Sequence, residues 1–223
     1  MTATLGGPRR TTKADSAYYE IRRKVLEGEL APGSVVEQEA LAKELGISTT
    51  PLREALRRLE ALGLLRQVAH REMRIAPLSV KEITDLYALR IRLEAYAARL
   101  GAKHASAEQR WEIRGLLEEP VAGTKVGQLE QNRGLHRAMY AAGGNHALAV
   151  TLDQLWDRAD RYRAILLRDD EIADTIHAEH SEIVDAFCDA QEAQIARLTK
   201  AHLESGRVRL LSVIAKAEQE TLG

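Results

Sequence analysis

Apolar residues recur at helical spacing through the first part of the chain. Ala17, Ile21 and Val25 lie four residues apart, which places them on one face of a helix that we expect over about residues 13–29. The Leu-Ala-Pro-Gly sequence at residues 30–33 then predicts a turn, because proline and glycine interrupt helices.

Two short helices follow, joined by a tight turn that contains glycine. The first covers about residues 37–45, and the second ends near Leu62. Either Ser48 or Thr50 caps the second helix, and in both cases Pro51 falls in its first turn, where the missing N–H costs nothing. Two short helices in this arrangement are typical of a helix-turn-helix.

The rest of the pattern predicts a hairpin and then only helices. Residues 64–76 are too short for another helix with its flanks, and Val68 and Ile75 bracket a polar tip, which indicates two strands joined by a turn. Residues 77–79 mark the expected domain boundary. The helices expected after it lie near residues 80–104, 107–119, 124–142, 146–168, 170–188 and 191–219.

Composition agrees with a helical globular protein. Of the 223 residues, 45% are hydrophobic and 29% are charged, which excludes a disordered chain and a membrane-embedded one. No apolar run approaches about 18 residues, and residues 1–13 lack the apolar stretch of a signal peptide, so we expect a cytoplasmic protein with no membrane partner. We expect a flexible tail at residues 1–12, and we expect the single Cys188 to be a small core residue.

The charge is distributed unevenly, but only slightly. Residues 1–78 contain 13 Lys and Arg against 10 Asp and Glu, whereas residues 79–223 contain 19 against 23. A mildly basic N-terminal part and an acidic C-terminal part are compatible with a DNA-binding domain joined to a domain that does not bind DNA. The asymmetry alone does not identify the partner.

The second helix of the helix-turn-helix separates apolar from polar residues. Leu52, Leu56 and Leu59 form its core stripe. The residues that point away from this stripe are Thr49, Thr50, Arg53, Arg57 and Arg58. Short hydroxyl groups at a helix N-terminus suit phosphate, and arginine can make two hydrogen bonds to guanine, so this face is a candidate DNA-recognition surface. The arginines could instead pair with Glu54 and Glu60 on a solvated face, and spacing alone does not decide between these interpretations.

Residues 30–76 resemble the winged helix-turn-helix of the GntR family of bacterial regulators. The stretch LAPGSVVEQEALAKELGISTTPLREALRRLEALGLL matches almost throughout the family pattern L-x-P-G, a Leu-Ala pair, and G-[IV]-S-x-T-P-[VL]-R-E-A-L-x-x-L-x-x-x-G-L. The resemblance implies a homodimer whose recognition helices and wings contact a palindromic operator. It assigns Arg53 to the arginine of the R-E-A-L segment, and Ser48 and Thr50 to the family's Ser and Thr.

Two residues depart from the family pattern. Thr49 stands where the family usually has Arg, which removes one contact to a base or phosphate. Glu72 stands where the wing tip usually has Gly, which places a carboxylate near the position of a phosphate. Arg57, together with His70 and Arg71 of the wing, remains an expected DNA contact. We therefore expect the family fold with an altered operator sequence and affinity.

Three histidines lie on three different helices of the expected helical body, namely His136, His180 and His202. Asn132 precedes His136 by one helical turn on the same face. Ligands spaced i, i+4 on one helix, joined by imidazoles from two others, are typical of metal sites in helical bundles, and such a site suits Zn, Ni, Mn or Fe. The residues alone leave open the alternative that the seven histidines scatter by chance.

Residues 80–215 resemble the FCD-type effector domain of the FadR subfamily of these regulators. EITDLYALRIRLEAYAARLGA matches its first helix, NRGLHRAMYAAGGN its D-x-x-x-H helix, and EHSEIVDAF its next ligand helix, with another histidine 22 residues after His180. The resemblance implies a divalent metal at the floor of a pocket for small organic acids, held by Asn132, His136, His180 and His202. Asn132 replaces the family's usual Asp, so a neutral carbonyl takes the place of a carboxylate and leaves the site one unit more positive.

An arginine on the first body helix is the leading candidate to bind the organic acid. Arg90 has Glu94 four residues on, so it could form a structural ion pair, whereas the family's equivalent arginine lies over the metal pocket and binds a ligand carboxylate. Further candidates to line the cavity are Tyr140, Trp156, Arg158 and Arg163. Of these, Trp156 is of a type that more often belongs to the core.

Together these features predict a mostly α fold, with a winged helix-turn-helix at residues 13–78 and an all-α antiparallel helical bundle of the FCD type at residues 79–223. The predicted function is a DNA-binding transcriptional regulator, a repressor, whose effector is a small carboxylate or sugar acid. The alternatives are a metal-responsive regulator, with the cation as effector, and a metal-dependent hydrolase. The chain lacks HExxH, and only Glu179 stands beside a ligand position as a general base, which argues against the hydrolase.

Overall fold

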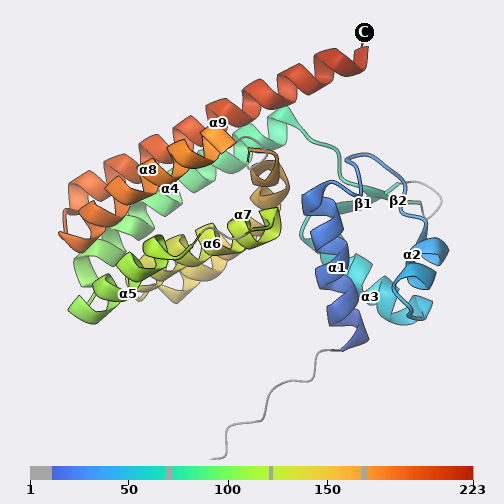
Figure 1. Cartoon of the computed structure of the whole chain (residues 1–223), viewed down its shortest axis with the longest axis horizontal. Helices are drawn as coiled ribbons and strands as arrows, with labels where there is room; N and C mark the ends of the chain where they lie inside the picture. Colours follow the sequence, from blue (N-terminus) through green and yellow to red (C-terminus); the bar gives the residue numbers. More distant parts are fainter. Residues whose placement is uncertain (1–11, 69–71, 121–122, 167–169, 223) are drawn as a thin grey trace, which may run out of the picture. The chain divides into compact units, whose positions relative to one another are not determined.

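The computed structural model describes residues 12–68, 72–120, 123–166 and 170–222 (Figure 1). The chain divides into two compact units between Pro77 and Leu78, and each unit is described by itself. All but the last residue of the predicted tail at 1–12 lies outside the described residues. None of the helices in the described ranges is long and apolar enough to cross a membrane.

The first unit begins with helix α1, Lys13–Glu27. The helix starts where the Thr12 side chain accepts a hydrogen bond from the backbone N–H of Asp15 while the Asp15 carboxylate accepts one from the backbone of Thr12. This capping box satisfies two backbone donors that a helix start leaves free. The helix ends at Gly28, whose φ of 85° is a left-handed conformation that favours glycine.

Helices α2, Gln38–Glu44, and α3, Thr49–Ala61, form the helix-turn-helix. Ser48 occupies the position before α3 in an extended conformation, and no capping bond from its side chain is present among the described residues. The core of this unit is apolar and includes residues from all three helices. Its fully buried members include Ile21, Leu52, Ala55, Leu56 and Leu59.

A small sheet completes the first unit. Strands β1, Leu65–Gln67, and β2, Met73–Ile75, pair antiparallel with Leu65 opposite Ile75, as a hairpin requires. The sequence analysis did not predict that the segment before α2 also joins this sheet. The backbone N–H of Val36 donates to the carbonyl of Met73 at 2.8 Å, and that of Ile75 donates to Ser34 at 2.9 Å.

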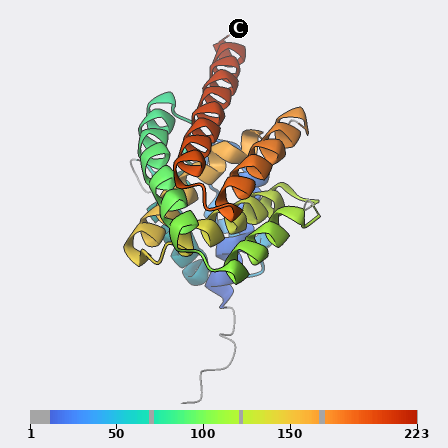
Figure 2. The same ribbon diagram turned by 90° about the vertical axis from the view of Figure 1, so that its left-hand side faces the viewer.

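The second unit is helical throughout its described residues, as predicted. Its helices are α4, Val80–His104; α5, Ala107–Glu118; α6, Lys125–Ala141; α7, His146–Leu166; α8, Asp170–Cys188; and α9, Glu192–Leu222. Ser79 caps α4 and Ser106 caps α5, each by accepting a hydrogen bond from a backbone N–H three residues on. Figures 1 and 2 show α4 and α9 running side by side. The predicted fold class is confirmed.

The buried residues of this unit form one cluster to which all six helices contribute. Glycine permits a close approach within it, between α4 and α6. A Cβ placed on Gly101 would lie 2.0 Å from the carbonyl oxygen of Met139, which belongs to the α6 backbone and cannot move aside alone.

We expect Gly101→Ala to lower the free energy of unfolding by about 1–3 kcal/mol, because the new methyl group forces the two helices apart. Gly134→Ala is the matched control, because Gly134 is exposed on α6 and its Cβ would meet nothing within 4 Å. There the higher helix propensity of alanine should leave stability unchanged or raise it by up to about 1 kcal/mol. Urea unfolding followed by circular dichroism measures both, and equal midpoints for the two variants would contradict the close packing.

Candidate functional site

The exposed side of α3 carries a set of polar residues that the sequence analysis selected. Its members at the helix start and along one face are Ser48, Thr49, Thr50, Arg53 and Arg57, all of them exposed. Arg53 and Arg57 also line a hollow beside Gln67 of β1. Among the described residues neither arginine forms an ion pair, so the predicted alternative of pairing with Glu54 or Glu60 is not what the structure shows. Both guanidinium groups are available for a partner.

Arg58 differs from its neighbours on the same helix. Its Nη1 lies 2.7 Å from the Asp15 carboxylate, and its guanidinium lies 4.3 Å from the centre of the Tyr18 ring. These contacts hold α3 against α1, and the hydrogen bond from Arg58 is the largest of the effects that lower the pKa of Asp15 to about 2. The prediction that Arg58 points away with the DNA-facing residues is corrected, because its guanidinium is engaged with Asp15 and Tyr18 of α1.

The wing carries the second predicted departure from the family pattern. The Glu72 carboxylate is held by the guanidinium of Arg74, which also donates to the carbonyl of Gly33 at 3.0 Å. The carboxylate that we expected to face phosphate therefore has its own counter-charge within the protein. The predicted wing contacts His70 and Arg71 lie outside the described residues.

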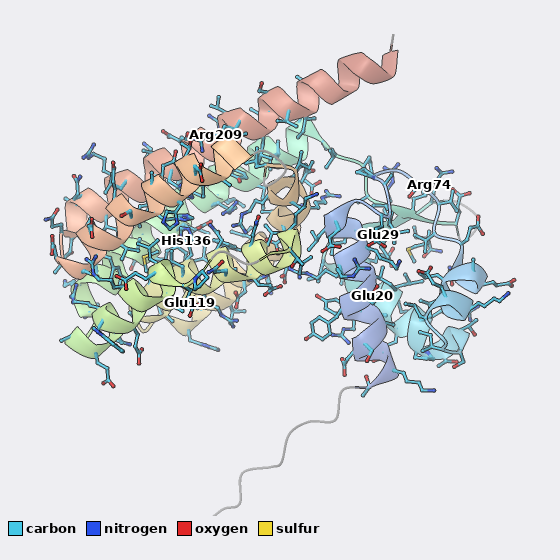
Figure 3. The ribbon with its side chains drawn as sticks, viewed as in Figure 1. Glu20, Glu29, Arg74, Glu119, His136 and Arg209 are labelled. Atoms are coloured by element: carbon cyan, nitrogen blue, oxygen red, sulfur yellow. The ribbon has the colours of Figure 1, made fainter. Side chains whose placement is uncertain are left out.

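The three histidines from α6, α8 and α9 come together inside the helical unit, where Figure 3 labels His136. One ring nitrogen from each of His136, His180 and His202 lies within 4.8 Å of the others. The Nε2 atoms of His136 and His180 are 3.0 Å apart, and both residues are buried. Nitrogens that share one ion at about 2.1 Å lie about 3–4 Å from one another, so this spacing suits a metal ion after small adjustments.

Two of the imidazoles are held by hydrogen bonds at Nδ1, one to a tyrosine backed by a glutamate and the other to a glutamate. The Tyr140 hydroxyl donates to Glu94 at 2.9 Å, so its oxygen is left to accept from the Nδ1–H of His136, also at 2.9 Å. The Nδ1–H of His202 donates to the Glu179 carboxylate at 2.6 Å. In both rings the Nδ1 proton is used in this bond, so Nε2 is the nitrogen left to bind a cation in place of its present contacts. Metal-binding histidines are commonly oriented in this way.

Burial favours the neutral form of the imidazoles. It lowers the pKa of His136 and of His180 well below the usual value, and the neighbouring imidazoles, with Arg163, add to this effect. Glu179 behaves differently: burial raises its pKa, but the hydrogen bonds from His202 and Arg209 outweigh burial, and the net pKa is lowered. At neutral pH His136 and His180 are therefore uncharged and Glu179 is ionised, and neutral imidazoles are the form that binds a metal.

Asn132 was predicted as a fourth ligand, and the structure gives its amide another role. The amide oxygen accepts a hydrogen bond from Arg163, while the amide Nδ2 lies 3.3 Å from the Nε2 of His180. Because a guanidinium can only donate, Arg163 fixes which end of the amide faces it. The oxygen that would bind a metal is therefore turned away from the histidines.

A cavity of about 40 Å³ lies against the histidine cluster. Its lining includes His136, His202, Asn132, Arg90, Arg163 and Arg209. Arg90 is 2% exposed and donates to Glu94 at 2.6 Å, so the predicted ion pair is present. The same guanidinium has a buried Nη1 with no hydrogen-bond partner among the described residues. The two interpretations of Arg90 are thus compatible, because one side of the group is paired and another is free.

Two other predicted cavity residues lie elsewhere. Tyr140 touches the cluster through His136 but does not line this cavity. Arg158 lies half-exposed at a separate hollow, where it pairs with Glu82 at 3.1 Å. The other two candidates, Trp156 and Arg163 of α7, do line the cavity, and the Arg163 guanidinium lies 4.1 Å from the centre of the Trp156 ring. Arg209 was missed, although its spacing of seven residues from His202 places both on one face of α9.

Family models match both units of the chain. Residues 13–73 match the model "Bacterial regulatory proteins, gntR family", and residues 85–205 match the FCD domain.

Similar proteins agree with this assignment. An uncharacterized HTH-type transcriptional regulator, BphR of Paraburkholderia xenovorans, is 30% identical over 86% of this chain and 82% of its own length. A probable D-xylose utilization operon transcriptional repressor of Paenarthrobacter nicotinovorans is 31% identical over 91% and 90%. The solved structure of E. coli McbR/YncC superposes with a TM-score of 0.75 at 19% identity, covering 92% of this chain and all of that one, which shows the same fold. The relatives are transcriptional regulators and not enzymes.

The lowered pKa values of His136 and His180 predict how the metal-free protein responds to acid. Below pH about 6.5 the unfolded chain protonates these rings while the folded protein keeps them neutral, so stability falls as the pH drops. Each ring contributes up to about 1.4 kcal/mol per pH unit between pH 6.5 and 5. Thermal unfolding in the presence of a chelator should show this slope, and His180→Gln should reduce it. His177→Gln, at an exposed residue one turn earlier, should leave the slope unchanged. An equal slope in the two variants would contradict the assignment of this pH dependence to the buried His180.

Proposed function

This chain belongs to the gntR family of bacterial regulatory proteins, and we propose that it is a repressor whose operator affinity is set by a small organic acid bound over a divalent metal ion. It is a DNA-binding transcriptional regulator by its family. The observation that carries the finer proposal is the histidine cluster with its oriented Nε2 atoms, next to a cavity with an unpartnered guanidinium nitrogen.

The metal would be held by His136, His180 and His202, with Asn132 outside the ligand set. Once bound, the ion would supply an electrostatic anchor for an acid group. A site built only of imidazoles favours Zn, Ni or Fe over Mn, which prefers oxygen ligands. Glu94, through Tyr140, orients His136, and Glu179 orients His202. Burial lowers the pKa of His136 and of His180, so both stay unprotonated at neutral pH.

The DNA surface would be the exposed face of α3 together with the wing. Ser48, Thr49 and Thr50 lie at the N-terminus of the helix, where backbone N–H groups suit phosphate, and Arg53 and Arg57 extend from its exposed side. We propose a homodimer that reads a palindromic operator, as two copies of one helix require symmetric half-sites. The segment at residues 13–78 would form the DNA-binding domain and residues 79–223 the effector and dimerisation domain.

Control of transcription would follow from linkage. The acid and the operator would each bind one conformation of the dimer better than the other. The factor by which bound acid changes the affinity for operator then equals the factor by which bound operator changes the affinity for acid. The relative from Paenarthrobacter is named as a repressor of a sugar-utilization operon, which supports repression as the mode.

A regulator that responds to the cation itself is the second candidate, favoured by the small volume of the cavity beside the histidines. Operator affinity that changes on chelation with no organic acid present would identify it.

Arg53→Ala should weaken binding to a duplex selected from random DNA by about tenfold or more, because a two-bond contact to guanine is lost. Fluorescence anisotropy measures the affinity, and the salt dependence separates base contacts from phosphate contacts. Arg197→Ala, at an exposed position of α9, is the matched control and should bind as the wild type does. Arg58→Ala should instead lower the melting temperature of the first unit. If Arg53→Ala binds the selected duplex as tightly as the wild type does, the assignment of α3 as the recognition helix is wrong.

Removing histidine ligands should remove the metal, whereas removing the Asn132 amide should not. We expect about one equivalent of metal per wild-type chain by mass spectrometry after purification and dialysis. His136→Ala with His180→Ala should lower this severalfold and abolish the change in operator affinity caused by acids. Asn132→Ala should retain the metal, because its oxygen faces Arg163. Loss of metal in Asn132→Ala, or retention in the double variant, would disprove this ligand set.

A further inference from the structure

A second hollow reaches the histidine cluster from another side. It is a groove of about 430 Å³ lined by residues of α5, α6 and α8, and it differs from the cavity that the arginines line. Asn132 and Ile176 line both hollows, so they stand between the two. Of the three clustered histidines, His180 is the one that lines the groove. Its volume lies within the range of about 300–1,000 Å³ that is usual for small-molecule sites.

The lining of the groove is apolar at its walls and acidic in its charge. Its apolar members are Leu116, Leu117, Leu135, Ala173 and Ile176. The exposed carboxylates of Glu119 and Asp174 also line it, and no lysine or arginine does so among the described residues. An organic acid would lie near like charges here, which is unfavourable. The groove therefore favours an uncharged molecule, in contrast to the neighbouring cavity with its three arginines.

The contacts of His180 determine which of its nitrogens carries the proton. The Nδ2 of Asn132 lies 3.3 Å from the Nε2 of His180, and Arg163 holds the amide oxygen of Asn132. Since an amide nitrogen can only donate, Nε2 is the acceptor of this bond, and the neutral ring has its proton on Nδ1. His180 therefore carries an N–H donor on the side of the ring away from Asn132.

This donor differs from its counterparts in the other two rings. The Nδ1 of His136 is bonded to Tyr140, and that of His202 to Glu179. The Nδ1–H of His180 has no hydrogen-bond partner in the described part of the chain, although the residue is only 5% exposed. Polar groups that are so little exposed are seldom left without a partner. Because His180 lines the groove, the groove is where an acceptor for this N–H can lie.

A second polar group stands on another wall of the groove. The half-buried amide of Gln128, from α6, lines the groove and makes no side-chain hydrogen bond with the described residues. Gln131 differs, because its amide nitrogen lies 3.3 Å from the carbonyl of Glu119 and 3.0 Å from that of Pro120. Gln128 and His180 can both donate to a ligand, so the groove presents two donors above an apolar surface.

We propose that the groove is a second ligand site, which takes an uncharged molecule with an apolar body and a carbonyl oxygen. The oxygen would accept a hydrogen bond from the Nδ1–H of His180, and Gln128 would bind a further polar group or share the same oxygen. The apolar body would lie against the leucines of α5 and α6. This site needs neither a metal ion nor an acid, so it goes beyond the proposed function and does not depend on it.

The test compares amides with carboxylates of the same shape. Ligand-observed NMR titration of the full-length protein would use benzamide against benzoate, and 3-phenylpropanamide against 3-phenylpropanoate. A chelator is present, and the pH is about 8, where exposed imidazoles are uncharged. The amide should bind at least tenfold more tightly than the carboxylate in at least one pair. A smaller ratio in both pairs, or no binding of either amide up to about 10 mM, would overturn the inference.

Two variants test whether the amide binds in this groove. Ala173→Phe would fill the groove and should weaken amide binding at least tenfold, whereas Ala178→Phe, at an exposed position of the same helix, should bind as the wild type does. Gln128→Leu keeps the size of the side chain and should weaken binding severalfold, and the exposed Gln154→Leu should not. Circular dichroism checks that each variant is folded. Undiminished binding in folded Ala173→Phe, or in Gln128→Leu if Ala173→Phe does not fold, would overturn the assignment.

Metal content and the response to acids separate this inference from the proposed function. If the amide binds in the groove but the protein holds no metal, the groove site stands and the proposed metal centre fails. If the protein holds metal and its operator affinity responds to acids but no amide binds, the proposed function stands and the groove site is wrong.

Discussion

A buried chain of hydrogen bonds links three helices of the second unit and constrains everything around it. It runs from Arg90 to Glu94, from Glu94 to Tyr140, and from Tyr140 to His136, whose other nitrogen meets His180. In the interior each of these groups is costly unless it is paired, so α4, α6 and α8 must adopt positions that satisfy all of them together. Because the chain ends where the ring nitrogens of His136 and His180 meet, the requirement that stabilises the bundle also gathers the ligands of a cation site.

The first unit uses its charges differently. Arg58 and Arg74 have partners within the protein, Asp15 and Glu72, while Arg53 and Arg57 form no ion pair among the described residues. The basic residues of the helix-turn-helix are thus divided between bracing the fold and facing outward. Pairing of Glu72 also weakens the expectation that this wing would repel phosphate, because the carboxylate brings its own counter-charge.

The sequence predicted the helices well where local signals agree. Residues 80–104 were expected as a helix, and α4 spans them, because Ser79 caps its start and the apolar stripe is continuous. The strand contact near Val35 was missed, since a stretch so short gains its partner only from the hairpin that forms later in the chain. Helix α9 continues past the expected end because no glycine or proline stops it.

The site was predictable only in part. The three histidines were found through resemblance to a family, and the pairs Arg90–Glu94 and His136–Tyr140 have the i, i+4 spacing that makes contact within a helix. The orientation of Asn132 was not predictable, because it is set by Arg163 from another helix. Contacts between distant segments decide which nitrogen or oxygen faces the centre, and spacing along the chain carries no such information.

The central claim is that the histidine cluster is a metal centre with three imidazole ligands. Crystals of the full-length protein grown with Zn would test it directly by anomalous diffraction at the Zn absorption edge. The account predicts one strong anomalous peak per chain, bonded to the Nε2 atoms of His136, His180 and His202, with the Asn132 oxygen still on Arg163. No peak there, with the His136 and His180 nitrogens still in contact with each other, would contradict it.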